Sequence, residues 1–518
     1  MEQETIVAVA TAPGTGGIAV IRLSGPEAFA IASKIWRGKN LAESEPYRAR
    51  YGSIVNPENG EIVDDALATP FRGPASFTGE NTVEFAVHGS RWIQREVVRL
   101  LIDAGARMAD HGEFTQRAFL NGKLDLAQAE GVADLIASSS RAGHRLAISQ
   151  TRGGFSRRLE ELREKLIEFA SLLELELDFS EEDVEFADRT RLRELADETL
   201  ATVNRLADSY SAGRALKEGV PVVIAGVPNA GKSTLLNALL GDDKAIVSDI
   251  PGTTRDVIED TAEIDGILFR FIDTAGLRDT ADKVERLGIE RTHRHIANAA
   301  ILIRLLDATQ PLPPQLQTLP TPIPNSPTDS NVGTSLRDVS PATDSTTESF
   351  STNSPTESIV GTSLRDVSKL PPANPSYSKL PQATPSYSKI PSATPTIITV
   401  INKSDLTSLQ ETSEITGATI TISAKTGQGL KELEQALVTA ATPHTEADLT
   451  VTNARHYEAL KRASAALTRA AESLQTTLSA DFIAQDIREA LHHLGAITGA
   501  ITTPDLLHSI FARFCIGK

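Results

Sequence analysis

The sequence predicts a multidomain protein of the α/β and α classes, with a parallel α/β domain inserted into a helical domain that follows an α+β domain. Strand-like apolar runs alternate with helical stretches from residue 220 to about 440, which is typical of a parallel sheet. The segments before and after this α/β region show helical periodicity. Short β-rich runs, punctuated by Pro and Gly, occupy the first 120 or so residues.

Length and composition limit the number of domains, the possible disulfides and the possible membrane segments. The chain has 518 residues, which suggests roughly three domains at about 150 residues each. Cys515 is its only cysteine, so no intramolecular disulfide is possible. The N-terminus does not resemble a secretory signal, and no apolar run approaches the roughly 18 residues of a membrane span. We therefore expect a cytoplasmic protein that makes no membrane contact.

The net charge is −17. This excludes a protein coated in basic surface for non-specific nucleic-acid binding, but it leaves room for a local basic patch or for a nucleic acid held by a partner.

We place the domain boundaries where the composition changes. The predicted α+β domain covers residues 1–121, with strands near 18–22 and 82–87. Residues 122–219 are helical in pattern, and residues 157–177 carry leucines at an amphipathic helix period. The α/β domain covers residues 220–443. Residues 444–518 resemble the first helical segment, so the two are expected to form one domain split by the insertion.

Residues 310–395 break the α/β pattern. They are rich in Pro, Ser and Thr and contain short repeats, such as the Val-Gly-Thr-Ser-Leu-Arg-Asp-Val-Ser at 332–340 and 360–368. We expect a disordered surface insertion, because this composition buries too little apolar area to offset the entropy of ordering. A phosphorylated or partner-binding segment is the alternative.

A complete phosphate-binding motif follows the first strand of the α/β domain. Residues 226–233 read Gly-Val-Pro-Asn-Ala-Gly-Lys-Ser, between an apolar strand run at 220–226 and a helix pattern at 234–240. Its glycines let backbone N–H groups converge on phosphates, Lys232 neutralises the β and γ charges, and the Ser233 hydroxyl ligates Mg²⁺. The predicted contacts from this segment are Asn229, Ala230, Gly231, Lys232, Ser233 and Thr234.

Three later strand runs are predicted, at 268–272, 300–306 and 396–401, and further motifs follow the first and the last of them. The Asp-Thr-Ala-Gly after the first supplies the predicted nucleotide contacts Asp273, Thr274, Ala275 and Gly276. Asp405 of Asn-Lys-Ser-Asp can accept from guanine N1 and its 2-amino group, which adenine cannot match. GTP is therefore favoured over ATP, with contacts from Asn402, Lys403, Asp405, Ser423, Ala424 and Lys425.

The segment between the phosphate-binding motif and Asp273 is expected to be a switch loop. Thr254 is expected to complete the Mg²⁺ shell when GTP is bound, and Ser248 and Thr253 are further predicted contacts. Leu277 stands where Ras-like enzymes place a water-orienting Gln. Hydrolysis is therefore slow, or another group orients the water.

Several motifs together resemble the MnmE (TrmE) family of tRNA-modification GTPases over essentially the whole chain except 310–395. They are Pro-Ala-Ser-Phe-Thr-Gly-Glu ending at Glu80, Gly-Glu-Phe-Thr-Gln-Arg-Ala-Phe at 112–119, Asn-Gly-Lys-Leu-Asp-Leu-Ala-Gln-Ala-Glu at 121–130, Gly-Thr-Thr-Arg-Asp at 252–256, and the terminal Phe-Cys-Ile-Gly-Lys. The phosphate-binding motif is shared by many families and does not discriminate.

The resemblance implies a GTP hydrolase that works as a homodimer with an FAD- and NADH-using partner, MnmG (GidA), in a heterotetramer. Together they would add an aminomethyl or carboxymethylaminomethyl group to C5 of the wobble uridine of certain tRNAs. The one-carbon unit would come from a reduced folate, either 5-formyl- or 5,10-methylene-tetrahydrofolate. The first domain would bind the folate and form the dimer.

The resemblance also assigns site residues. Arg22, Glu80, Lys123 and Lys518 are the implied folate contacts. A K⁺ ion would take the place of an arginine finger, bound by Asn229, Ser248, Ile250 and Thr253. Glu285 would then orient the water in place of a Gln at 277, so that Glu285 and Lys232 are the catalytic residues.

A GTP switch that acts in ribosome assembly, binding RNA without modifying it, is the alternative function. The first-domain motifs and the Cys-Ile-Gly-Lys tail argue against it. The sequence leaves open the amine donor, the tRNAs served, the role of residues 310–395, and whether Cys515 is catalytic.

Overall fold

The computed structural model describes residues 4–178, 189–227, 229–244, 260–272, 299–310, 395–406, 419–442, 450–475 and 480–517. The predicted insertion lies outside these residues, except for its two end positions. None of the described helices combines the length and apolarity needed to cross a membrane.

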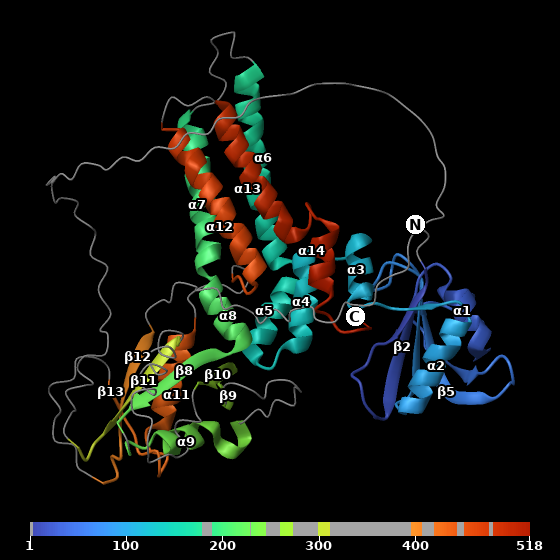
Figure 1. Cartoon of the computed structure of the whole chain (residues 1–518), viewed down its shortest axis with the longest axis horizontal. Helices are drawn as coiled ribbons and strands as arrows, with labels where there is room; N and C mark the ends of the chain where they lie inside the picture. The colour runs from blue at the N-terminus through green and yellow to red at the C-terminus, as the bar shows by residue number, and fades with distance from the viewer. Residues whose placement is uncertain are drawn as a thin grey trace, which may run out of the picture. The chain divides into compact units, whose positions relative to one another are not determined.

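The first part of the chain forms a seven-stranded mixed sheet in the order β3-β4-β5-β6-β2-β1-β7. It is drawn in blue in Figure 1, where β2 and β5 are labelled. Alternating side chains from its strands pack with two helices into one apolar core, which is why these runs read as half-buried strands. The elements are β1 (Ile6–Val9), β2 (Ile18–Ser24), α1 (Ala28–Ile35), β3 (Trp36–Gly38), β4 (Arg50–Val55), β5 (Ile62–Phe71), β6 (Thr82–His88), α2 (Arg91–Asp103), β7 (Arg107–Met108) and α3 (Glu113–Leu120).

The helical segments on either side of the α/β part pack together. Helix α12 lies against α7 and α13, and α13 lies against α6 (Figure 1). Leu159, Leu166 and Leu460 are among the fully buried side chains. The helices are α4 (Leu126–Ala137), α5 (Arg141–Thr151), α6 (Gly154–Asp178), α7 (Arg189–Asp208), α8 (Tyr210–Glu218), α12 (Ala454–Ser473), α13 (Ala480–Thr498) and α14 (Pro504–Phe511).

A buried charge cluster also joins the two helical segments. Glu130 on α4 accepts from His456 Nε2 at 2.6 Å and from Arg455 Nη2 at 2.9 Å, both on α12. Arg455 donates further to the carbonyl oxygens of Ala496 and Ile497 at the end of α13. Since both Glu130 oxygens and all three Arg455 guanidinium nitrogens have partners, the cluster avoids the cost of an uncompensated buried charge.

The inserted part is a six-stranded sheet in the order β13-β12-β11-β8-β10-β9, in which only the β9–β10 pair is antiparallel. Strand β8 begins and ends at the residues predicted from its apolar run. The elements are β8 (Val220–Gly226), α9 (Lys232–Lys244), β9 (Asp260–Ile264), β10 (Ile267–Phe271), β11 (Ile301–Asp307), β12 (Thr396–Asn402), β13 (Thr419–Thr421) and α11 (Leu430–Ala441).

Strand β9 was not among the predicted strands. It pairs with β10 through a two-residue turn in which Asp265 and Gly266 both have positive φ, at 49° and 83°. That is the conformation of a tight hairpin turn for which Asp-Gly is the favoured sequence. The turn also explains why β10 begins at Ile267, one residue earlier than the predicted 268–272 run.

The sheet core includes two helical residues from outside the α/β segment. Leu146 of α5 and Leu216 of α8 belong to the same buried cluster as Val222 and Leu305. In addition, the backbone N–H of Ala142 on α5 donates to the carbonyl oxygen of Gly266 at 2.9 Å. The β9–β10 hairpin is thereby bonded to the start of α5.

Candidate functional site

The phosphate-binding loop leaves β8 at Gly226 and ends where α9 begins at Lys232. Asn229 has φ of 64° and Gly231 has φ of 93°, so the loop makes a left-handed turn before the helix. A Cβ at Gly231 would collide with the side-chain amide of Asn402, which explains the glycine at this position. The N-terminal N–H groups of α9 therefore face the loop, as an anion site requires.

Lys232 reaches back over this loop. Its Nζ donates to the carbonyl oxygens of Gly226 and Val227 at 3.0 and 3.1 Å. The side chain is half-buried, and burial lowers the pKa of its ammonium group. An ammonium that is partly desolvated and contacts neutral carbonyls is suited to bind a polyphosphate, which would restore its charge balance.

The end of β12 is joined to the phosphate-binding loop by one side chain. Asn402, which is 3% exposed, donates from Nδ2 to the carbonyl oxygen of Ala230 at 2.9 Å. Its Oδ1 accepts from the backbone N–H of Ala424 at 2.9 Å. Ser423 Oγ, in turn, donates to Asp405 Oδ1 at 2.7 Å, which orients a carboxylate on an otherwise exposed residue.

Lys403, the residue directly after β12, has a φ of 67°. Its Nζ forms an ion pair with Asp307 Oδ2 at 2.7 Å. Burial opposes ionisation of Asp307, but hydrogen bonds from Lys403 and Thr309 outweigh it and lower the pKa of this carboxyl. Sequence reasoning did not single out Asp307. Its position at the end of β11, beside β12, was the signal available.

The structure thus brings together two groups of predicted nucleotide contacts, which are Asn229 to Thr234 and the residues Asn402, Lys403, Asp405, Ser423, Ala424 and Lys425. The other predicted residues of this site lie outside the described residues. They are Ser248, Ile250, Thr253, Thr254, Asp273, Thr274, Ala275, Gly276, Leu277 and Glu285.

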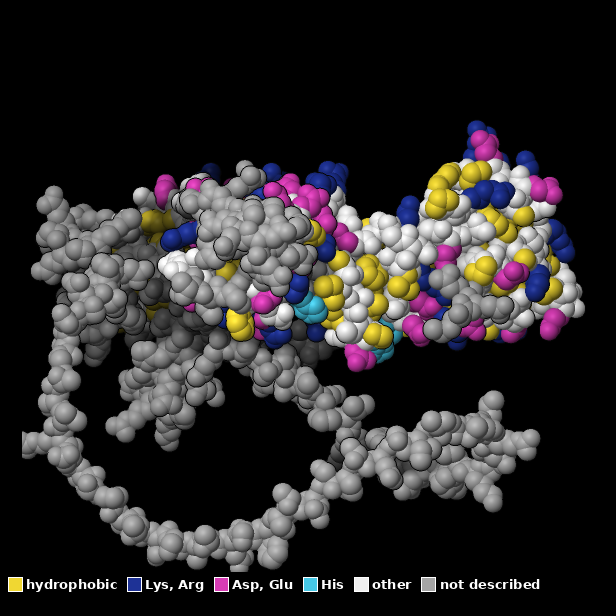
Figure 2. Space-filling view, turned by 90° about the horizontal axis from the view of Figure 1, so that it is seen from above, with side chains coloured by type: hydrophobic (Ala, Val, Ile, Leu, Met, Phe, Trp, Pro, Cys, Tyr) yellow, Lys and Arg dark blue, Asp and Glu magenta, His cyan; other side chains and the backbone are white. Residues whose placement is uncertain are grey.

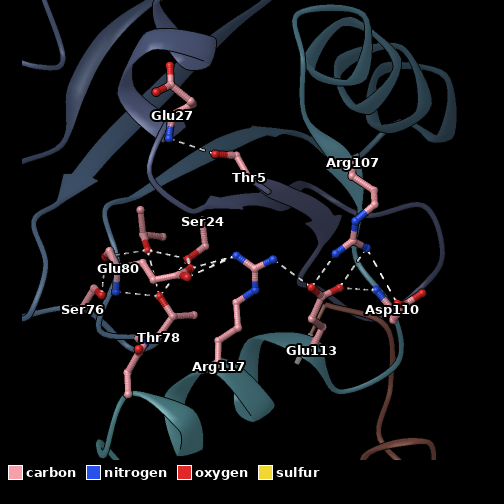
Figure 3. Close-up of polar contacts among 12 residues, drawn as sticks. Thr5, Ser24, Glu27, Ser76, Thr78, Glu80, Arg107, Asp110, Glu113 and Arg117 are labelled. Atoms are coloured by element: carbon pink, nitrogen blue, oxygen red, sulfur yellow. Dashed lines mark hydrogen bonds and ion pairs between the residues drawn. The ribbon is translucent and has the colours of Figure 1, made fainter. Parts of the chain in front are cut away.

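A second cluster of polar side chains lies in the first part of the chain (Figure 3). Glu80 accepts from Arg117 Nη1 at 3.2 Å on both carboxylate oxygens and from Ser24 Oγ at 2.8 Å. The Glu80 and Arg117 side chains are only 8% and 7% exposed. Thr78 and Ser76 bond the backbone of Glu80, so the carboxylate is held firmly in place.

Arg117 also links Glu80 to a second carboxylate. Its Nη2 donates to Glu113 Oε1 at 2.8 Å, and Arg107 Nη2 donates to the same oxygen at 2.7 Å (Figure 3). Burial opposes ionisation of Glu113, but Arg107, the backbone N–H of Asp110 and Arg117 together lower its pKa. Arg117 and Ser24 were missed at the sequence level, although Arg117 belongs to a motif used for the resemblance.

Arg22 lies on β2 near this cluster, between two aromatic rings. Its guanidinium carbon is 5.4 Å from the ring centre of Phe77 and 5.6 Å from that of Phe114. Its Nε donates to Glu84 at 2.8 Å. Among contacts with described residues, its two terminal nitrogens have no hydrogen-bond partner.

The other predicted folate residues are less enclosed. Lys123 Nζ donates to the carbonyl oxygen of Pro74 at 3.1 Å, on the loop that leads to Glu80. The C-terminal segment lies against the first domain, because the Gly112 N–H donates to the Cys515 carbonyl oxygen at 3.4 Å and Gly517 contacts Val9. Cys515 is exposed. Lys518 lies outside the described residues.

A loop of complete P-loop sequence between β8 and α9, bonded through Asn402 to the residues predicted to recognise guanine, defines the class as a P-loop GTPase. Residues 126–515 match a family model described as the MnmE helical domain. Residues 5–123 match one described as the N-terminus of the GTP-binding protein TrmE. The chain belongs to the MnmE family of tRNA modification GTPases.

Curated relatives agree over the full length. A tRNA modification GTPase MnmE of Parabacteroides distasonis is 46% identical over 526 residues, which covers 99% of this chain and 100% of the relative. One of Bacteroides fragilis is 47% identical over 534 residues, and one of Flavobacterium johnsoniae is 42% identical over 532 residues. Both of these matches cover 100% of each chain.

Proposed function

We propose that this tRNA modification GTPase couples potassium-dependent GTP hydrolysis to modification of the wobble uridine of certain tRNAs. Acting in the cytoplasm as a homodimer with an FAD-dependent partner, it adds an aminomethyl-type group at C5 and uses a reduced folate as the one-carbon donor. The observation that carries the proposal is the Asn402 side chain, which bonds both the phosphate-binding loop and the base-recognition segment.

The described residues suit a Mg²⁺-bound guanine nucleotide. Ser233 is the first hydroxyl of α9, one position after Lys232, where the motif provides a Mg²⁺ ligand. Thr254 would be the second protein ligand. Asp405 supplies the acceptor for guanine, and Lys232 supplies the cation for the β- and γ-phosphates. Magnesium would add the charge that stabilises the leaving diphosphate.

The K⁺ proposal rests on Asn229. This residue is exposed at the tip of the phosphate-binding loop in a left-handed conformation. Its amide oxygen would bind the ion together with Ser248, Ile250 and Thr253. Glu285 would orient the attacking water, because Leu277 cannot.

Folate binding is supported by an acceptor site on Glu80 and by the terminal nitrogen donors of Arg22. A carboxylate accepts about four hydrogen bonds, and Glu80 receives three, so one acceptor site on Oε1 remains for the amide-like edge of a pterin. The terminal nitrogens of Arg22 suit the carboxylates of the folate tail, with Phe77 beside them. Lys123 and Lys518 would add further positive charge.

A salt comparison tests the GTPase part. GTP hydrolysis is measured in KCl and in NaCl at matched ionic strength, and the rate should be high only in KCl. Glu285→Ala should lose turnover and keep GTP binding, whereas Glu432→Ala, an exposed carboxylate on α11, should behave as the wild type. Equal rates in the two salts would refute the K⁺ role.

The folate part is tested separately. Arg22→Ala should weaken binding of 5-formyl-tetrahydrofolate in equilibrium dialysis and leave GTP hydrolysis unchanged. Arg37→Ala, which alters an exposed arginine on β3, is the matched control. Nucleoside analysis of tRNA from a deletion strain that carries each variant then reports wobble-uridine modification. Unchanged folate affinity in the Arg22 variant would contradict the assignment.

A further inference from the structure

Helix α5 carries a row of arginines on its solvent side. Arg141 and Arg145 on α5 and Arg152, the C-cap residue directly after it, are all exposed, and their spacing of four and seven residues places them within about 40° of one another around the helix axis. The opposite side is buried through Leu146, Ala147 and Gln150. The row is about 16 Å long at 1.5 Å per residue.

A fourth arginine extends the row into α6. Arg157 is exposed, and its Nη1 donates to the carbonyl oxygen of Arg152 at 3.0 Å. Its guanidinium therefore lies at the C-terminal end of α5. We call Arg141, Arg145, Arg152 and Arg157 the α5 basic row.

Two members of the row are unfavourably placed for the helix itself. Arg141 begins α5, where the helix dipole is positive and the first turn has no acidic residue, and Arg145 lies one turn further along. They are also four residues apart, and like charges at this spacing repel each other. Such local costs without a compensating interaction are typical of residues kept for function.

No described carboxylate forms an ion pair with any arginine of the row. Glu263 comes near but accepts only from the backbone N–H of Arg141, at 3.4 Å. Other arginines of the helical domain do have acidic partners, namely Arg158, Arg163, Arg193, Arg214, Arg455, Arg462, Arg469 and Arg488. Arg205 and Arg513 also lack one among the described residues, but each stands by itself on its own segment.

On the face shown in Figure 2, basic and acidic side chains are interspersed, as expected for a chain of net charge −17. An uncompensated row of four arginines in such a protein is a local exception. Its charge complements a linear polyanion.

We propose that the α5 basic row is a docking surface for the phosphate backbone of the tRNA substrate. Arginine guanidinium groups bind phosphate oxygens bidentately, and a linear row follows consecutive phosphates of one strand. These contacts position the RNA without reading its sequence. The Ala142–Gly266 hydrogen bond attaches the row directly to the GTPase domain.

The test is an Arg145→Glu/Arg152→Glu double variant of the full chain. Binding of unmodified tRNA is titrated at several KCl concentrations. We expect affinity to fall roughly tenfold or more, and the slope of log K against log salt to become shallower by about 0.7–0.9 for each phosphate that the variant no longer neutralises. Both positions are exposed, and neither arginine forms an ion pair with a described carboxylate, so the variant should fold and hydrolyse GTP normally.

The matched control is Arg462→Glu/Arg469→Glu on α12, which makes the same change in net charge at exposed arginines that have acidic partners. It should bind tRNA within about twofold of the wild type. Equal weakening in both variants would show a net-charge effect and overturn the proposal. So would unchanged affinity in the α5 variant, absence of tRNA binding by the wild type at low salt, or abolished modification with tRNA binding intact, which would assign the row to a protein partner.

Discussion

The side-chain amide of Asn402 donates to the carbonyl oxygen of Ala230 at 2.9 Å, across 172 positions of sequence. Its other end accepts from Ala424. One buried amide therefore joins the loop predicted to bind phosphates to the segment predicted to recognise the base. We therefore expect the affinity for a nucleotide that spans the two to depend on this link.

Replacing this amide should loosen the nucleotide site. Asn402→Ala leaves the Ala230 carbonyl and the Ala424 N–H without their partner, at a cost of about 1–3 kcal/mol. We expect GTP affinity to fall roughly 10- to 100-fold in a fluorescence titration with a labelled guanine nucleotide. Gln435→Ala, an exposed amide on α11, should have no effect. Wild-type affinity in Asn402→Ala would mean that the link is dispensable.

Base specificity should follow Asp405. Asp405→Asn replaces an acceptor by an amide that can donate to the 2-keto oxygen of xanthine, and its own oxygen can still accept from Ser423. We expect GTP affinity to fall about 100-fold or more and XTP affinity to rise, because an unmatched polar pair is strongly rejected. Competition between XTP and GTP for the bound labelled nucleotide measures this. A variant that still prefers GTP would refute the role of Asp405.

The two arginines that bind Glu113 should differ in their effect on stability. Arg117 is 7% exposed and pairs with both Glu113 and Glu80, whereas Arg107 is 39% exposed. Arg117→Gln should lower the free energy of unfolding by about 3–5 kcal/mol, since it leaves buried carboxylates uncompensated. Arg107→Gln should cost about 1 kcal/mol or less, because solvent screens its charge.

Tryptophan fluorescence can report this difference, because both tryptophans of the chain, Trp36 and Trp92, belong to the first domain. Urea titrations of Arg117→Gln and Arg107→Gln are compared with the wild type. Similar urea midpoints for the two variants would contradict the importance of burial at Arg117.

The buried Glu130 cluster should make the helical bundle sensitive to acid. Burial opposes ionisation of Glu130, but His456 and Arg455 outweigh it and lower its pKa to about 2. A pKa lower in the folded state than in the unfolded state gives stability that is fully present above the unfolded value of 4.5. This stability is lost as the pH falls from there towards the folded value.

Glu130→Gln should therefore lower the free energy of unfolding at pH 7 by about 3–5 kcal/mol and flatten its dependence on pH below about 5. Urea unfolding followed by helical circular dichroism at several pH values measures both. Glu160→Gln, at an exposed ion pair with Arg163, is the control and should change the midpoint little. If the free energy of unfolding of Glu130→Gln depends on pH as that of the wild type does, a group other than Glu130 dominates the acid sensitivity.

The sequence by itself determined the class of each part of the chain and several element positions. Strand β8 lies at the predicted 220–226, and β12 extends the predicted 396–401 by one residue. Helix α6 covers the predicted 157–177 with a few more residues at its start. These features follow from apolar patterns and turn residues that act over a few positions, so a single sequence shows them.

The phosphate-binding motif was readable for the same reason, since its glycines, lysine and serine lie within eight positions between a strand and a helix. The roles of these residues stay predictions that the binding experiments test. The Asp-Gly turn at 265–266 was equally local, and it was overlooked.

Only the tertiary structure decided which charges meet. Glu80 and Arg117 are 37 positions apart, Lys403 and Asp307 are 96 apart, and Glu130 and His456 are 326 apart. No local rule links such residues, because their pairing depends on which helices and strands the apolar cores bring together. The α5 basic row needed both kinds of information. Its spacing is written in the sequence, whereas the lack of acidic partners among the described residues is a property of the fold.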